Sequence, residues 1–175
     1  VIIWSRVGLP LLRSWRHELR IDRVVRESGD LVSVYVRGRN LAQLGAQGGQ
    51  FFSWRFLTRH WWWQAHPYSL SAGANGSWLR ITVKDLGDQS GALTQLCPGT
   101  RVIAEGPYGV FTANARRTPR IVAFAAGVGI TPIRALLDDV PPSVEVTLVY
   151  RIATTDADSV ALGDELEAIF SRRGW

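Results

Sequence analysis

The sequence predicts two structural units: a six-stranded antiparallel Greek-key β barrel, followed by part of an α/β domain with a parallel sheet. Three observations lead to this fold class. Short runs of alternating apolar and polar residues, separated by Gly, Asn and Asp turns, fill the chain up to residue 108. From residue 120 onward the runs become continuously apolar, and each precedes a helical pattern. A polar stretch over residues 113–119 separates the two patterns.

Each run of the first unit has the length and the flanking turns of a strand. Over residues 31–38, three valines recur at every second position, as in a strand with one buried face. Turn signals at 27–30 and 75–76 separate neighbouring strands. A short helix is expected over 90–96. The predicted strands cover residues 19–25, 31–38, 50–57, 66–71, 77–84 and 101–107.

In the second unit, two strands alternate with two helices. The run IVAFAAG (121–127) has no polar side chain, which indicates a strand covered on both faces. It enters a glycine-rich turn and then a helix over 130–140. VEVTLVY (144–150) predicts the second buried strand, and 158–173 predict an amphipathic helix. The apolar side of that helix carries Leu162, Leu166, Ile169 and Phe170.

An open parallel sheet generally has about five or six strands, so we expect this second domain to be truncated. The chain has no methionine, which makes it a fragment or a processed product in our interpretation. The predicted boundaries are residues 1–18 for a basic lead-in, 19–115 for the barrel and 119–175 for the partial domain.

Composition excludes several classes of protein. Apolar residues make up 46% of the chain, which is enough to build a core, so we expect the chain to fold and not to be disordered. A single cysteine, Cys97, excludes an internal disulfide framework. The three histidines are scattered, and no Cys/His group has zinc-ligand spacing, so no metal site is predicted. The net charge of +5 favours an anionic partner, such as a phosphate, a nucleotide, a nucleic acid or a membrane surface.

The opening VIIWSRVGLPLL leaves two interpretations open. The sequence contains no 18-residue apolar run, so no segment is expected to span a bilayer by itself. Because arginines follow at 13, 16 and 20, the opening can be the emerging end of a membrane helix with basic residues on the cytoplasmic side. It can equally be an ordinary amphipathic lead-in.

Four Gly-, Ser-, Thr- or Pro-rich segments follow one another along the chain. They are HPYSLS (66–71), GDQSGAL (87–93), EGPYG (105–109) and GVGITP (127–132). In HPYSLS, the ring of Tyr68 can lie against a flat heteroaromatic ring, and Ser69 can hydrogen-bond a ring nitrogen. The segment can also be a plain barrel strand with its aromatic side chain in the core.

GDQSGAL and GVGITP can each bind an anion where a helix begins. Ser90 can cap its helix and leave the following amides free. Gly127 and Gly129 allow a bulky ligand to approach the backbone, and the free N–H groups of the helix start favour a phosphate. Thr131 can donate its hydroxyl, and Pro132 suits the first helical turn. Either segment can also be a simple tight turn.

In this order, the four segments resemble the FAD-binding barrel and the start of the NAD(P)H-binding domain of the ferredoxin-NADP reductase superfamily, over roughly residues 19–170. His66 stands where the usual motif has arginine, and His-Pro-aromatic-Ser/Thr is similar to the ferric reductase and NADPH oxidase branch. Gly49-Gln50-Phe51 also matches the Gly-Gln-aromatic strand that this family places before the flavin motif.

The resemblance implies an FAD-dependent NAD(P)H oxidoreductase whose flavin carries the chemistry, with Ser69 near flavin N5 and no protein acid, base or metal. Arg55 or Lys84 could replace the missing arginine. The implied contacts are His66, Pro67, Tyr68 and Ser69 for the flavin ring and ribityl chain; Thr82, Val83 and Lys84 for the adenine side or pyrophosphate; Gly87, Ser90, Gly91 and Ala92 for the pyrophosphate; and Gly127, Gly129, Thr131, Pro132 and Arg151 for NAD(P)H.

By the same resemblance, the electron acceptor is the haem of an upstream transmembrane domain, and the module lies at the cytoplasmic face of the membrane as part of a longer protein. The family's later Cys-Gly-Pro turn and terminal aromatic residue are absent, so we expect the fragment to transfer hydride poorly. The preference between NADH and NADPH, the terminal acceptor and the oligomeric state stay open.

Two alternatives remain beside this interpretation. One is a soluble ferredoxin or flavodoxin reductase. The other is a basic nucleic-acid-binding barrel, favoured by a pI near 10.1 and eight tryptophans. We expect no nucleic-acid partner, because Trp61, Trp62 and Trp63 gather in one loop instead of alternating along strands. That loop covers a cofactor edge or approaches a membrane interface.

Overall fold

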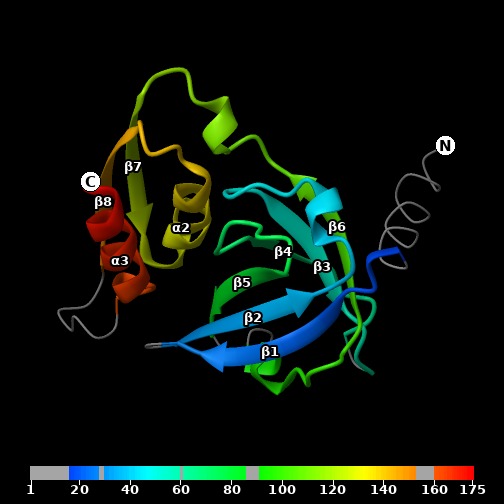
Figure 1. Cartoon of the computed structure of the whole chain (residues 1–175). Helices are drawn as coiled ribbons and strands as arrows, with labels where there is room; N and C mark the ends of the chain where they lie inside the picture. The colour runs from blue at the N-terminus through cyan, green and yellow to red at the C-terminus, as the bar shows by residue number, and fades with distance from the viewer. Residues whose placement is uncertain (1–15, 28–29, 60, 86–90, 153–159) are drawn as a thin grey trace.

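A computed structural model of the chain describes residues 16–27, 30–59, 61–85, 91–152 and 160–175, which form an antiparallel part and a parallel part (Figure 1). All six predicted strands of the antiparallel part are present, and the predicted fold class is confirmed. The strands are β1 (Arg20–Arg26), β2 (Leu31–Arg37), β3 (Phe51–Phe56), β4 (His66–Ser69), β5 (Trp78–Lys84) and β6 (Val102–Tyr108).

The six strands form two antiparallel sheets instead of one continuous ladder. Their orders are β1-β2-β5 and β4-β3-β6, and isolated bridges at Arg20–Arg101 and Leu70–Ile81 link the two sheets. The inner faces enclose a core in which Phe52, Trp54 and Phe56 of β3 are fully buried. Alternation along β3 therefore places every second side chain inside, as its sequence pattern predicts.

Two short 3₁₀ turns, η3 (Gly91–Gln95) and η5 (Gly127–Gly129), stand where the sequence predicts a helix and a glycine-rich turn. The predicted helix over 90–96 is the 3₁₀ turn η3 (Gly91–Gln95). It is held because Leu93 and Leu96 are buried in the core of the antiparallel sheets. The other 3₁₀ turns among the described residues are η2 (Leu41–Leu44), η4 (Ala113–Ala115) and η5 (Gly127–Gly129).

The parallel part contains β7 (Arg120–Ala126), α2 (Ile130–Asp139), β8 (Glu145–Arg151) and α3 (Gly163–Arg173). Strands β7 and β8 pair in parallel, with Arg120 opposite Glu145 and Ala126 opposite Arg151. Both helices contribute to one apolar core with these strands. The βαβα order predicted from the sequence is confirmed.

Two details of this part differ from the prediction. Strand β7 is covered on one face only, since Val122 and Phe124 are 61% and 72% exposed. Both described helices pack on the face that carries Ala123, which leaves the opposite side chains uncovered. Helix α3 begins at Gly163 instead of 158, because Leu162 adopts a left-handed conformation with φ 57°; residues 158–159 lie outside the described part.

Helix α2 joins the two parts, since it lies between β7 and the antiparallel sheets (Figure 1). Its Ala135 is fully buried in the core of the antiparallel sheets, whereas Leu136 and Leu137 belong to the second core. The helix thus uses two faces for packing and fixes the parts against each other. Among the residues that the structure describes, no helix is long and apolar enough to cross a membrane.

Candidate cofactor site

The HPYSLS segment forms β4, an edge strand whose position is set by the aromatic core. Tyr68 lies opposite Phe52 on β3, and His66 lies opposite Trp54. The indole Nε1 of Trp54 donates a hydrogen bond to the carbonyl oxygen of Tyr68 at 3.1 Å. Because Phe52 and Trp54 are fully buried, the backbone of β4 and the directions of its side chains are fixed.

His66 and Tyr68 present a stack of flat rings at this edge. Their ring centroids are 5.8 Å apart with an interplanar angle of 6°, and Trp61 contacts the His66 ring from another side at 5.9 Å. The Nε2 atom of His66 is buried and has no hydrogen-bond partner among the described residues. An unpaired buried nitrogen beside stacked rings fits a ligand that is itself flat and carries hydrogen-bonding groups.

Burial also sets the charge of this edge. It lowers the pKa of the His66 imidazole below 6.5 and raises the pKa of the Tyr68 phenol above 10, so both side chains are neutral at pH 7. His66 therefore does not supply the positive charge that arginine gives in the usual motif. Lys84 is exposed at the end of β5, and Arg55 alternates with Trp54 on β3 and faces away from His66.

We expect the free energy of unfolding of the chain without bound ligand to increase as the pH rises from about 5 to 7. The folded pKa of His66 is lowered, so the unfolded chain binds more protons in this window and stability increases with pH. Above pH 6.5 the free energy of unfolding is not reduced by His66. It decreases as the pH falls below 6.5 toward the folded pKa of His66. Urea unfolding at several pH values measures this slope, and His66→Gln should remove part of it. An unchanged slope in that variant would contradict the assignment.

Thr82 belongs to a buried network of hydroxyl groups on β5 and its neighbours. Its hydroxyl donates to Ser71 Oγ at 2.7 Å and contacts Ser33 Oγ at 2.8 Å, and Arg80 Nε donates to the same Ser71 oxygen at 3.0 Å. Val83 faces the core of the antiparallel sheets. The predicted contacts of Thr82, Val83 and Lys84 with a cofactor thus remain predictions, and the side chain of Thr82 already has structural partners.

The predicted pyrophosphate segment is described only in part. Gly87 and Ser90 lie outside the described residues, while Gly91 and Ala92 begin η3. Their assignment to a cofactor stays a prediction. Cys97 is exposed and close to the end of this segment.

GVGITP forms η5 and the start of α2, with open space over its glycines. Gly127 has φ +51°, which favours glycine, and a methyl group at Gly127 or Gly129 would meet no atom within 4 Å. The Thr131 hydroxyl donates to the carbonyl of Val128 at 3.0 Å, so it stabilises the turn itself. Because Arg151 lies opposite Ala126, its backbone lies next to the turn, and Pro132 follows in the first turn of α2.

Strand β5 is where the two predicted cofactor segments meet. Strand β4 lies against β5, to which it is linked by the Leu70–Ile81 bridge. The turn η5 also lies against β5. Strand β4 and the open glycine turn therefore both lie against β5, although about sixty residues separate them in the sequence.

An ion-pair cluster that sequence reasoning missed holds this arrangement. The Arg80 guanidinium of β5 donates to both carboxylate oxygens of Glu165 on α3, at 2.6 and 2.8 Å. Arg134 of α2 donates to Glu165 at 2.7 Å and to Asp138, whose carboxylate accepts the Gly73 amide at 2.9 Å. We name Arg80, Arg134, Asp138 and Glu165 the interface cluster. The only sequence signal was a polar Arg80 and Thr82 alternating with apolar neighbours in β5.

The charges in the interface cluster reinforce one another. Burial opposes ionisation of Glu165, but hydrogen bonds and attraction from Arg80 and Arg134 outweigh it and hold the pKa of the carboxyl below its usual value. Burial likewise opposes the charged form of Arg80, but its bonds to Glu165 raise the pKa of the guanidinium. Arg80 and Glu165 are therefore both charged at neutral pH. Among the described residues, no three His, Cys, Asp or Glu side chains lie close enough to hold a metal ion.

Comparison with known proteins gives the same fold and order of segments. The chain is 30% identical over 158 residues to an NADPH oxidoreductase of Mycobacterium tuberculosis, covering 86% of this chain and 41% of that protein. It is 27% identical over 143 residues to NADPH oxidase 3 of Rattus norvegicus, covering 74% of this chain and 24% of that protein. The chain thus spans less than half the length of these relatives, and no protein-family model matches it.

A solved structure shares the arrangement of the two parts. The flavohem-like FAD/NAD binding domain of nitric oxide dioxygenase from Vibrio cholerae aligns with a TM-score of 0.68 at 22% identity, over 90% of this chain and 70% of that domain. The resemblance of the chain to the ferredoxin-NADP reductase superfamily is therefore supported both by sequence and by fold. The names of these relatives agree with the predicted enzyme class, an FAD-dependent NAD(P)H oxidoreductase, and with the predicted cofactors, FAD and NAD(P)H.

Proposed function

We propose that this chain binds FAD along β4 and receives NAD(P)H at the η5 turn, as the electron-entry module of a longer oxidoreductase. The observation that carries the proposal is the meeting of both segments on β5. Two ligands held there lie beside each other, which hydride transfer between two cofactors requires. The distant relatives named NADPH oxidase and NADPH oxidoreductase support the same assignment.

The residues of β4 would hold the flavin ring. The Tyr68 ring, half-buried and neutral, offers an apolar surface for stacking and keeps water from one face of a bound ring. The buried Nε2 of His66 and the Ser69 hydroxyl have no hydrogen-bond partner in the described part of the chain and are available to a ligand. FAD held by these residues would supply the redox chemistry, which is acceptance of a hydride and release of single electrons.

The η5 turn would hold the nicotinamide nucleotide. Gly127 and Gly129 leave space above the backbone, and the positive end of the dipole of the ten-residue helix α2 favours a phosphate there. Arg151 adds a positive charge beside the turn, which favours a phosphorylated ribose. The side chains present supply no acid or base for the reaction; they bind, orient and exclude water.

The electron acceptor that we propose is the haem of a transmembrane domain, which would place the module at the cytoplasmic face of a membrane. The HPYSLS form of the flavin motif and the NADPH oxidase relative support this branch. A soluble reductase of the ferredoxin or flavodoxin type is the alternative. The sequence encoded upstream of residue 1 distinguishes the two, because only the first requires transmembrane helices there.

Retention of FAD tests the proposal directly. After incubation with FAD and desalting, the chain should keep the visible absorption of the flavin. Tyr68→Ala should weaken binding by about tenfold or more, because aromatic stacking on a heterocycle contributes about 1–3 kcal/mol. Titration of flavin fluorescence gives the dissociation constants.

Two controls make the result specific. Tyr68→Phe keeps the ring and should bind FAD nearly as well as the unmodified chain. Phe124→Ala removes an aromatic side chain of β7 that is 72% exposed and remote from β4, and it should have no effect. A folded chain that retains no FAD, or Tyr68→Ala binding as tightly as the unmodified chain, would refute the β4 site.

A further inference from the structure

The loop between β3 and β4 carries two tryptophans whose side chains are not packed into the core. Trp61 turns inward, since its ring contacts His66 at 5.9 Å and packs on the core, and its amide donates to Thr58 Oγ1 at 3.2 Å. The Gln64 amide then closes the turn on the Trp61 carbonyl. Anchoring Trp61 in this way leaves Trp62 and Trp63 outside, 61% and 63% exposed.

Apolar and basic residues belong to the same loop and to the strand end beside it. Leu57 is 38% exposed at the start of the loop, and its amide donates to the carbonyl of Arg101 at 2.9 Å, which places Arg101 beside the loop. Arg59 and Arg101 are exposed, and the described residues give neither of them an ion-pair partner. We name Leu57, Arg59, Trp62, Trp63 and Arg101 the tryptophan patch.

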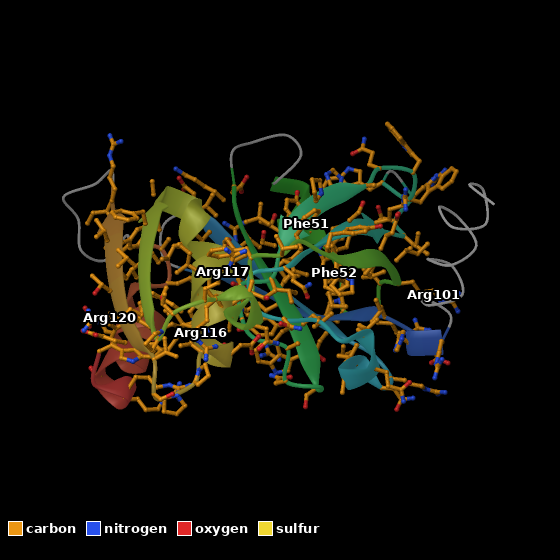
Figure 2. The ribbon with its side chains drawn as sticks, turned by 90° about the horizontal axis from the view of Figure 1, so that it is seen from above. Phe51, Phe52, Arg101, Arg116, Arg117 and Arg120 are labelled. Carbon is orange, nitrogen blue, oxygen red and sulfur yellow. The ribbon has the colours of Figure 1, made fainter. Side chains whose placement is uncertain are left out.

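The segment that carries most of the patch is basic. Residues 31–84 contain six arginines and lysines but no aspartate or glutamate. Glu105 on the adjacent strand β6 is an acidic side chain near this segment, and its carboxylate accepts the Tyr108 hydroxyl at 2.6 Å. Figure 2 shows Arg101 at the opposite end of the molecule from Arg120 of β7, so the patch lies on the side of the antiparallel sheets away from the parallel part.

We propose that the tryptophan patch is a contact surface for an anionic lipid bilayer. Exposed indoles beside arginines match the interface between headgroups and acyl chains, where tryptophan is enriched and arginine meets lipid phosphate. A nucleic acid could use the same charges, but bases need rings arranged along a groove, whereas these two indoles stand side by side in one turn. The inference deepens the proposed membrane location and names the surface that makes the contact.

Co-sedimentation with vesicles tests this surface on the full chain. Vesicles of phosphatidylcholine with phosphatidylserine should bind the chain more tightly than phosphatidylcholine alone, and added salt should weaken the binding. The double variant Trp62→Ser/Trp63→Ser should reduce partitioning on the order of tenfold. Arg59→Gln/Arg101→Gln should reduce it about fivefold per arginine on the anionic vesicles, with little change on the neutral ones.

Matched variants and a second readout separate this inference from the flavin site. Phe124→Ser and Arg117→Gln remove an exposed aromatic side chain and an exposed arginine outside the patch, and they should leave vesicle binding unchanged. FAD retention, measured on the same samples, should be equal in all patch variants. A chain that retains FAD but does not bind anionic vesicles overturns the inference and not the flavin site.

Two further outcomes would also overturn it. One is unchanged vesicle binding in the double tryptophan variant. The other is binding of a single-stranded oligonucleotide, lost in the patch variants, under conditions in which vesicles are not bound.

Discussion

Replacing Glu165 by alanine should lower the free energy of unfolding by about 3 kcal/mol, because it leaves Arg80 buried without its counter-ion. The Arg80 side chain is only 5% exposed, and both of its terminal nitrogens donate to this one carboxylate. Removing one partner of a buried pair costs more than the pair contributes, since the remaining charge keeps its desolvation penalty. Urea unfolding at pH 7 measures the loss.

Variants of the same interface make this result specific. Glu167 lies two residues further along α3 and is exposed, so Glu167→Ala should change stability by less than about 0.5 kcal/mol. The double variant Arg80→Met/Glu165→Leu removes both charges and should recover part of the loss. A stability of Glu165→Ala equal to that of Glu167→Ala would show that the cluster does not hold the interface.

The same carboxyl predicts a dependence on pH. Because the pKa of Glu165 is lowered in the folded state, its contribution is present above its ordinary value of 4.5 and is lost as the pH falls through the folded value. In Glu165→Gln this part of the acid destabilisation should be absent. Since η5 contacts β5, the strand that carries Arg80, loosening the cluster should also weaken NAD(P)H binding more than FAD binding.

Gly48→Ala should lower stability by about 3 kcal/mol, because the added methyl group would overlap the backbone of α2. An ideal Cβ at this glycine falls on the carbonyl of Ala135 and close to the amide of Leu136, and neither backbone group can rotate away. The Gly48 amide also donates to Asp139 at 2.6 Å, a bond that would be lost if the loop moved aside. For a chain of this size the melting temperature should fall by about 6–12 °C.

The neighbouring loop offers a control. Gly45 has φ +63° and open space around it, so Gly45→Asn, a residue that tolerates this conformation, should change the melting temperature little. Thermal unfolding followed by circular dichroism compares the two variants. An equal effect of both substitutions would mean that backbone freedom, and not the contact with α2, accounts for the loss.

The sequence by itself determined the strands and the order of the cofactor segments. Alternation with a period of two is a local property, so the valines of β2 and the aromatic residues of β3 reveal their buried faces without any partner. The glycine turn after β7 is equally local. The family resemblance followed from the spacing of these local signals, which tertiary contacts do not alter.

Only the tertiary structure decided which distant side chains meet. Nothing in the local pattern pairs Arg80 with Glu165, since 85 residues separate them and either charged side chain could equally be solvated by water. The coverage of β7 likewise depends on which helices pack against it, and this left Val122 and Phe124 exposed against the prediction. The periodicity of a sequence shows which side chains of one helix or strand lie on the same face. Which other element covers that face depends on the packing of the whole chain, and so does the exposure of Trp62 and Trp63.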